Sequence, residues 1–224
     1  LGILTETEQN KPTRDYLAKR EGLERAAFTT DDAAAGAAEL KGRGLAALGP
    51  IHFSRPVDLP GGGTGEASFN VFRWPLDQNP GGLRIFACQH LTRDTVWIPE
   101  LQSHANGVQR IVRLEVLSPD PKAAAEHLGR LIDEPVRAEG DGWLVPSGGR
   151  RADVLFYDAA GFARRYTQAV RDGAASEGAV ALVLASNDLD GAKAALGPLA
   201  TVHDGAVSVA ASAANGIVVS IVPQ

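Results

Sequence analysis

The chain has 224 residues, 44% of them hydrophobic, which is enough for one or two globular domains with a sizeable core. Its formal net charge of -5 argues against a general nucleic-acid binder, because such proteins attract phosphate with clustered Lys and Arg. The single cysteine, Cys88, excludes an internal disulfide and a cysteine-rich zinc site. We find neither a signal segment nor an apolar run of the ~20 residues that span a bilayer, so we expect a cytoplasmic protein.

One pattern occurs three times: an apolar strand-like run, a polar break and an alanine-rich helix. The copies are AAFTTDDAAAGAAELKGRGL from Ala26, LEVLSPDPKAAAEHLGRLID from Leu114 and LVLASNDLDGAKAALGPLA from Leu182. Ser, Thr, Asp and Asn at such a break cap a helix by accepting the free amide hydrogens of its first turn. The repeat therefore predicts a tandem array of β-α modules.

In chain order, residues 1–22 indicate the end of a strand and a polar connector. A strand is expected at 23–29, followed by a helix from Asp31 or Asp32 to about Gly42. The Pro- and Gly-rich stretch 49–65 is expected to be a long connection. Strands are expected at 66–74 and 83–91, so that the first full module is a strand, a helix and then two or three antiparallel strands.

The second half of the chain repeats this order after a polar crossing segment at 92–109. The elements expected for the second copy are a strand at 110–117, a helix at 121–132 and strands at 142–147 and 152–158. The third copy begins near Val180, and its HDG and ANG phrases are turns between short strands. The expected order in each unit is therefore strand, helix and then further strands.

The phrases SRPVDLPGGGTGEASF, FACQHLTRDTVW and ELQSHANGV resemble the glyoxalase-like proteins of the vicinal oxygen chelate superfamily. The resemblance implies an α+β fold of tandem βαβββ modules, paired into cup-shaped mixed sheets. It also implies four modules in two cups, with the first module truncated. We expect 1–22 to end that module, 23–110 to complete the first cup, and 111–224 to form the second cup from two degenerate modules.

In metal-binding members, the resemblance implies His or Glu ligands on the first and last strands of paired modules. The first-strand ligand stands seven residues before the Asp that opens the helix. In the first copy this position is Glu24 or Arg25, and in the later copies it is Arg113 and Ala181. Arginine and alanine cannot ligate a cation. We therefore predict that the second cup binds no metal.

Glu24 and His90 occupy the two ligand positions of the first full module, so we predict both as catalytic and metal-binding residues. The cofactor expected is one divalent metal ion, or none. Period-two alternation along 84–90 does not decide whether His90 or Gln89 points into the cup. The alternative to metal binding is that Glu24 is a solvated carboxylate at the start of a strand. The partner ligands would lie in the truncated module, where Gly2 stands at the position of an expected Glu.

Five further residues are predicted to bind substrate, namely Arg55, Arg73, Trp74, Gln89 and His104. Arg55 is suited to a two-pronged contact with an anion, and its alternative partners are Asp58 and Glu66. Trp74 either forms the cup wall, with its neighbour Arg73, or packs inside the protein. His104 is placed to close the mouth of the cup.

The predicted function is a glyoxalase-like protein that binds a small, oxygen-rich molecule in the first cup and acts on it as a metal-dependent lyase, isomerase or dioxygenase. The alternative is a non-catalytic, metal-free protein that sequesters its ligand. A third reading makes the second cup an intramolecular or dimer interface. The expected partner is a small molecule, with neither nucleic acid nor membrane, and a homodimer is left open.

Overall fold

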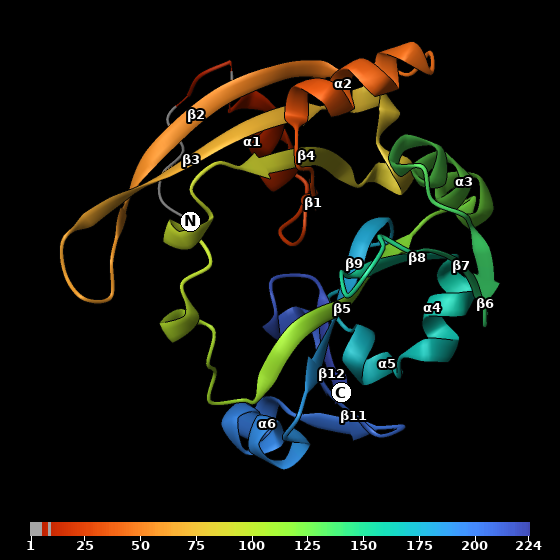
Figure 1. Cartoon of the computed structure of the whole chain (residues 1–224). Coiled ribbons are helices and arrows are strands. Elements are labelled where there is room, and N and C mark those ends of the chain that lie inside the picture. Colours follow the sequence, from red (N-terminus) through yellow and green to blue (C-terminus); the bar gives the residue numbers. More distant parts are fainter. Residues whose placement is uncertain (1–5, 9) are drawn as a thin grey trace.

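The computed structural model describes residues 6–8 and 10–224, which form two sheets (Figure 1). The elements of the N-terminal part are α1 (Lys11–Leu17), β1 (Arg25–Thr29), α2 (Ala33–Gly42), β2 (Leu48–Asp58), β3 (Thr64–Arg73) and β4 (Arg84–His90). Their four strands pair in the order β1-β4-β3-β2, with β1 parallel to β4 and the other pairs antiparallel. This is one βαβββ module.

The C-terminal part contains two more modules of the same order. The first comprises β5 (Val108–Leu117), α3 (Pro121–Ile132), β6 (Arg137–Glu139), β7 (Gly142–Val145) and β8 (Asp153–Tyr157). The second comprises β9 (Gly178–Ser186), α6 (Leu189–Leu196), β10 (Thr201–His203), β11 (Ala206–Val209) and β12 (Val218–Pro223). Antiparallel pairing of β5 with β9 joins them in one eight-stranded sheet, β10-β11-β12-β9-β5-β8-β7-β6. The predicted α+β fold of paired βαβββ modules is confirmed.

The threefold repeat corresponds to the three strand-helix pairs β1-α2, β5-α3 and β9-α6. Each helix begins after an aspartate, Asp32, Asp120 or Asp188, whose side chain accepts an amide hydrogen of the first turn. This is the local geometry that the sequence pattern predicts. The truncated module expected before β1, with Gly2 at a ligand position, lies outside the described residues.

One expectation for the first 65 residues is wrong. The stretch 49–65 is not a connection, because most of it belongs to the 11-residue strand β2 and the start of β3. Strand β2 is an edge strand, and an edge tolerates Pro50 and Pro56 because one row of its backbone groups has no partner strand to meet. The polar connector in 1–22 contains helix α1, which begins with Pro12 in its first turn.

Two short helices, α4 (Ala159–Arg165) and α5 (Gln168–Arg171), lie between β8 and β9, where the sequence predicts no element. They pack on the face of the large sheet opposite α3 and α6, as Figure 1 shows. In the paired-module fold this face is the inside of the cup. The second cup is therefore filled by its own chain.

The small sheet and the large sheet share a continuous core. Buried residues of α2, β3 and β4 belong to the same cluster as those of α3, β5 and β8. The turn between β3 and β4 comes so close to the large sheet that a Cβ at Gly81 would lie 3.0 Å from Val116 and 3.3 Å from Phe156. With its φ of 56°, Gly81 suits both the turn and the close approach. No helix of the described residues is long and apolar enough to cross a membrane.

Candidate functional site

The small sheet has two chemically different faces. Ile85 and Ala87 of β4 face helix α2 and join the main core, whereas Phe86 and Cys88 join a separate small cluster on the other face. His90 has the same parity as Phe86 and Cys88 and stands opposite Phe69 of that cluster. This second face, which we call the inner face, is the side of the sheet that corresponds to the inside of a cup. His90 therefore points to the inner face.

Gln89 points the other way and holds the start of helix α2. Its amide group donates to the Asp31 carbonyl at 2.8 Å, and its side-chain oxygen accepts from the Ala33 amide at 3.2 Å and from Asn70 at 3.2 Å. These bonds use both ends of the side chain. The alternative that the sequence left open, His90 or Gln89 inside the cup, is thereby decided in favour of His90.

His90 lies in a row of rings across the inner face. The ring centroids of Phe53 and Phe69 are 5.2 Å apart, those of Phe69 and His90 are 5.1 Å apart, and those of His90 and Trp97 are 6.1 Å apart. Arg93 lies over the Trp97 ring at 5.3 Å. Phe53 and Trp97, at the two ends of the row, are 44% and 48% exposed. The inner face thus presents an accessible aromatic wall with one imidazole in it.

The Nδ1 atom of His90 is buried and has no hydrogen-bond partner; among the described residues, only Trp74 Nε1 shares this condition. Burial lowers the pKa of His90 below its ordinary value of 6.5, and the positive charge of Arg93 lowers it further. The ring is therefore neutral at pH 7, with one nitrogen able to accept a proton or a hydrogen bond. Nearly all buried polar groups in proteins are paired, so this unpaired nitrogen, although shielded from solvent, marks His90 as the candidate polar group of the inner face.

Glu24 lies far from His90. It precedes β1, whose first residue Arg25 stands opposite Arg84, and His90 is six positions further along β4. At ~3.3 Å per residue the separation is roughly 20 Å, whereas ligands of one ion lie within ~2.3 Å of it. Both oxygens of Glu24 form ion pairs, one with Arg84 and one with Arg25. The structure therefore does not bring the two predicted metal ligands together.

The described residues do not fit a divalent metal centre. Nowhere in 6–8 and 10–224 do three or more His, Cys, Asp and Glu side chains converge as an ion would require. The orphaned nitrogen of His90 supplies one donor, and its neighbours on the inner face are aromatic or aliphatic. Cys88 is buried, which raises its thiol pKa and disfavours the thiolate. We therefore derive no chemical step through a metal.

The remaining predicted residues are spread over the module. Arg55 lies on the inner face beside Phe53, is exposed, and forms no ion pair with Asp58 or Glu66, which are both among the described residues. Arg73 is exposed at the last position of β3, four residues after Phe69. Trp74 is only 5% exposed and packs against Phe72 in the main core, so we do not retain it as a contact.

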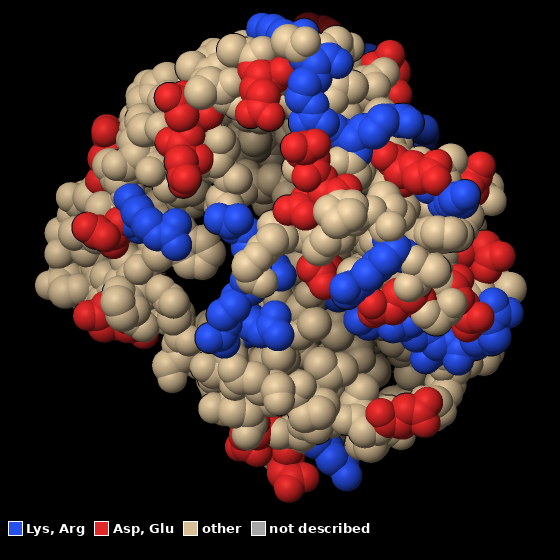
Figure 2. Space-filling view, turned by 45° about the vertical axis from the view of Figure 1, so that its right-hand side comes forward, with Lys and Arg blue, Asp and Glu red and all other residues tan. Residues whose placement is uncertain are grey.

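His104 is exposed in the crossing segment between β4 and β5, and its carbonyl accepts the Gly107 amide in a turn. The space-filling view shows an opening in the molecule with Lys or Arg side chains at its rim (Figure 2). Sequence reasoning missed Phe53, Phe69, Trp97 and Arg93. Their signal was the aromatic content of β2 and β3 together with the RDTVW phrase that follows His90.

The second cup contrasts with the inner face of the first module. Its central group is Glu115, which is 0% exposed. Tyr157 and Tyr166 donate their hydroxyl groups to one carboxylate oxygen at 2.6 and 3.0 Å. Arg113 and Arg165 approach the other oxygen at 2.7 and 3.2 Å. Burial and the Glu115 charge raise the pKa of both tyrosines, so they stay protonated as donors.

Two of these partners, Arg165 and Tyr166, come from the end of α4, inside the cup. Arg113, at a position where metal-binding members have a ligand, is engaged by Glu115, and Ala181 stands opposite Glu115 on β9. Sequence reasoning passed over Glu115, although a lone carboxylate in the run LEVL was its signal. Every oxygen of this carboxylate is used within the chain, so the network stabilises the fold and offers no free group.

Two cavities lie at joints between the modules. The larger, ≈ 1060 Å³, is lined by Glu24 and Arg84 on one side and by the start of β9 on the other. Arg20 bridges it by donating to the carbonyls of Glu177 at 2.6 Å and Ala179 at 2.8 Å. Glu24 is therefore accessible from this cavity, but its charge is already paired.

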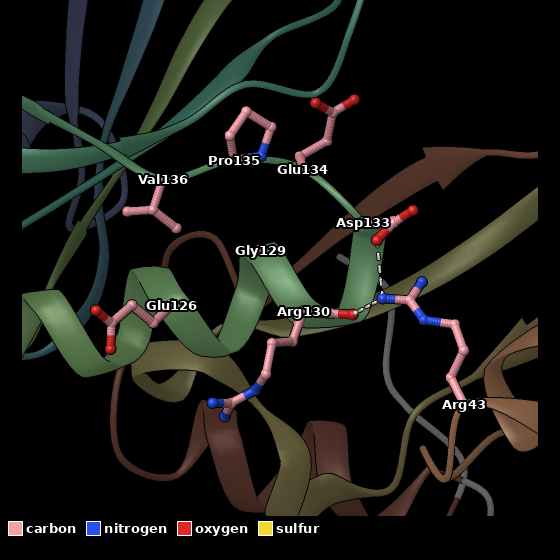
Figure 3. Close-up of a pocket in the computed structure, with 8 residues that line it drawn as sticks. All are labelled: Arg43, Glu126, Gly129, Arg130, Asp133, Glu134, Pro135 and Val136. Carbon is pink, nitrogen blue, oxygen red and sulfur yellow. Dashed lines mark hydrogen bonds and ion pairs between the residues drawn. The ribbon is translucent and has the colours of Figure 1, made fainter.

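The smaller cavity, ≈ 530 Å³, lies at the end of helix α3 (Figure 3). Arg43, just after α2, reaches across it to the Arg130 carbonyl at 3.1 Å and to Asp133 at 2.9 Å. This contact closes the end of α3 with a cation, which suits the carbonyl-rich end of a helix. The cavity marks a structural joint and lies away from His90.

A family model described as a glyoxalase-like domain matches residues 3–132, more than half of the chain. The chain belongs to this glyoxalase-like family. The superfamily expected from the phrases around His90, the vicinal oxygen chelate superfamily, is thereby confirmed. The match covers the His90 face and helix α3, so both belong to the family's domain. A search of curated proteins finds no match.

Solved structures resemble this glyoxalase-like protein in fold. A hypothetical protein from Staphylococcus aureus aligns with a TM-score of 0.66 and 13% identity, over 98% of this chain and 75% of that one. A Mn(II)-bound glyoxalase from Novosphingobium aromaticivorans aligns with a TM-score of 0.46 and 13% identity, over 89% and 62%. A methylmalonyl-CoA epimerase from Mycobacterium tuberculosis aligns with a TM-score of 0.38 and 14% identity, over 54% and 95%. At 13% identity, the likeness to the Staphylococcus aureus protein concerns the fold alone.

Proposed function

We propose that this glyoxalase-like protein binds a small organic molecule on the inner face of its N-terminal module, with His90 as the polar contact. The observation that carries the proposal is the buried, unpartnered Nδ1 of His90 within a row of accessible rings. Leaving such a nitrogen unpaired costs about 1–3 kcal/mol. Because Nδ1 is shielded from solvent, the imidazole must turn outward before a ligand can donate a hydrogen bond to it and remove this cost.

The proposed binding uses no metal, because among the described residues the inner face offers rings, aliphatic side chains and the buried Cys88, and no group of three or more metal ligands forms around His90. In an enzyme, the neutral imidazole would accept a proton from the bound molecule, and its lowered pKa keeps that base available at neutral pH. The metal-dependent lyase, isomerase or dioxygenase remains the competing function. It requires donors besides His90 at the inner face.

The test is a screen of oxygen-containing fragments by ligand-observed NMR, with the imidazole signals of the protein as the second readout. We expect fragments that perturb His90 to lose binding in His90→Phe, which keeps a ring in the row but removes both nitrogens. The matched control is His203→Ala, an exposed histidine in β10 of the large sheet, and it should bind as the unmodified chain does. Fragments that bind His90→Phe equally well, or the absence of any fragment at His90, would contradict the proposal.

A titration with Mn²⁺ separates the two functions. Because the metal-free proposal gives His90 no companion ligands, we expect no saturable broadening of its signals at stoichiometric Mn²⁺. Saturable broadening centred on His90, abolished in His90→Phe and retained in His203→Ala, would instead establish the metal-dependent alternative.

A further inference from the structure

Strand β1 is one edge of the small sheet, and its outer side carries backbone groups without partners. The Arg84 amide donates to the Glu24 carbonyl at 3.1 Å, so Glu24 and every second residue after it turn their backbone groups toward β4. The N–H and C=O groups of Arg25, Ala27 and Thr29 therefore point away from β4. None of them forms a hydrogen bond within the part of the chain that the structure describes. Such a row is a template for a further strand.

The two edges of the small sheet are built differently. Strand β2, at the opposite edge, contains Pro50 and Pro56 and shifts its register against β3 after Leu48. Prolines and bulges are devices by which proteins prevent an edge from pairing. Strand β1 has neither, because its sequence RAAFT pairs with β4 in an unbroken register and its one charged side chain, Arg25, already forms an ion pair with Glu24. The sheet is thus protected at β2 and open at β1.

The chain itself shows how two of its modules pair. In the large sheet the first strands of the two C-terminal modules, β5 and β9, are antiparallel neighbours, and Leu114 stands opposite Leu182. Each of these residues is six positions before the aspartate that caps the following helix, and Ala26 of β1 is six positions before its own capping aspartate. Two of the three modules in the described chain are therefore paired through this position. The N-terminal module carries the same strand with no partner strand beyond β4 among the described residues.

We propose that β1 pairs antiparallel with β1 of a second copy of this chain, in the register that joins β5 to β9. A strand that pairs with its own copy forms a two-fold symmetric interface, the commonest arrangement of a homodimer. Ala26 then stands opposite Ala26 of the partner subunit, and Arg25 stands opposite Ala27 of the partner subunit. The second pair corresponds to Arg113 opposite Val183 in the large sheet. The occupant is a second copy because it supplies the same strand and capped helix as the pair already formed within this chain.

The backbone groups that β1 leaves free are the ones that this register uses. In an antiparallel pair, opposite residues alternate between those that exchange hydrogen bonds and those that do not. Ala26 has its backbone groups turned to β4, so the Ala26 pair at the two-fold axis belongs to the second kind. Arg25 and Ala27 have free outward groups, and opposite each other they exchange both hydrogen bonds. A register shifted by one residue would set free groups opposite groups already used by β4.

The side chains that meet at the axis also suit a symmetric pair. A residue on a two-fold axis faces its own copy, so a charge there would meet a like charge. Ala26 avoids this, and Arg25 faces an alanine rather than its own copy. Opposite residues of paired strands point to the same face, so the two inner faces lie on one side of the joint sheet. The exposed Phe53 and Trp97 of both copies are then on that side.

Cysteine cross-linking tests the register directly. Opposite residues that do not exchange hydrogen bonds have Cα atoms about 4.5 Å apart, within the range of about 4.4–6.8 Å that a disulfide spans. Ala26→Cys should therefore give a covalent dimer on a non-reducing gel after the full chain is oxidised with copper phenanthroline. The matched control is Ala27→Cys, because the two copies of position 27 lie roughly 8 Å apart in this register, beyond the ~7 Å limit. The unmodified chain controls for Cys88, which is buried.

The mass in solution tests the pairing without a cross-link. We expect the unmodified chain to be a dimer in size-exclusion chromatography with light scattering, and to dissociate on dilution. Ala27→Pro removes an outward amide that the dimer uses and leaves the amides that face β4 in place, which an edge strand tolerates. By symmetry the dimer loses two hydrogen bonds, so its dissociation constant should rise about tenfold or more. Circular dichroism shows whether the variant is folded.

A cross-link confined to Ala26→Cys, together with a dimer that Ala27→Pro dissociates, supports the pairing through β1. Ala27 is the more exposed of the two positions, so this result reports geometry rather than thiol access. A chain that is monomeric at every concentration, equal cross-linking of the two cysteine variants, no cross-link in either, or a dimer that survives in folded Ala27→Pro overturns it. Ligand binding at His90 is measured separately and is unaffected by these outcomes.

Discussion

The inner face of the first module and the second cup are built from the same βαβββ unit, but they treat their central polar group in opposite ways. In the second cup, Glu115 receives two tyrosine hydroxyl groups and two guanidinium groups from its own chain. On the inner face, His90 Nδ1 receives nothing, and of the two rings beside it Phe69 is buried while Trp97 is 48% exposed. The two faces therefore differ in whether the described chain pairs the central polar group.

The largest expected effect comes from breaking the Glu115 network. Glu115→Gln removes the negative charge and leaves Arg113 and Arg165 close together without a counter-charge in the second cup. Removing one partner of a buried ion pair costs about 3–5 kcal/mol of unfolding free energy. Urea unfolding monitored by circular dichroism measures it.

The control for that prediction is Glu139→Gln, which removes the carboxylate of an exposed pair with Arg137 in the same sheet. It should cost less than about 1 kcal/mol. Equal losses in the two variants would contradict the view that the filled cup depends on Glu115.

A smaller effect tests whether the three copies of the repeat are equivalent. Replacing Asp32, Asp120 or Asp188 by Ala removes the side-chain acceptor at a helix start, and each change should cost about 1 kcal/mol of unfolding free energy. Thermal unfolding of the three single variants gives the comparison. Asp190→Ala, in the first turn of α6 but not its cap, should cost less than Asp188→Ala, and a reversal would refute the capping assignment.

The smallest effect is the pH dependence that His90 contributes. Its pKa in the folded protein is lowered from 6.5, so the unfolded chain takes up a proton first as the pH falls. The contribution of His90 to stability is therefore fully present above about pH 6.5 and decreases as the pH falls from there through the folded pKa. Unfolding free energies between pH 7.5 and pH 5, roughly the range in which histidine titrates, should fall less steeply in His90→Phe.

The Arg93 charge provides the check on this last prediction. In Arg93→Gln the NMR-determined pKa of His90 should rise toward its ordinary value, because one of the two causes of the shift is removed. Burial, the larger cause, persists in that variant, so the rise should be partial. An unchanged pKa of His90 in this variant would show that the Arg93 charge does not act on the imidazole.

The helices of the repeat were predictable because their signals are local. An aspartate cap and an alanine-rich run fix a helix start within a few residues, and α3 begins and ends where the sequence predicts. Strand β2 was not predictable in this way. Its glycines and prolines indicate a loop, and only its place at the edge of the sheet makes Pro50 and Pro56 acceptable there. Helix α4 gave no periodic signal because it is short and sits inside a cup.

In the candidate site, too, some features depend on local sequence and others depend on the tertiary structure. The sequence by itself determined the family and the three strand-helix copies, and it predicted His90 as a site residue, because these inferences depend on residue types in a short phrase. Only the tertiary structure decided that His90 faces the rings while Gln89 holds α2, since the parity of a strand has no meaning until a helix covers one face. The tertiary structure also separated Glu24 from His90 and filled the second cup around Glu115, because distances between strand ends and the packing of α4 depend on how the strands pair.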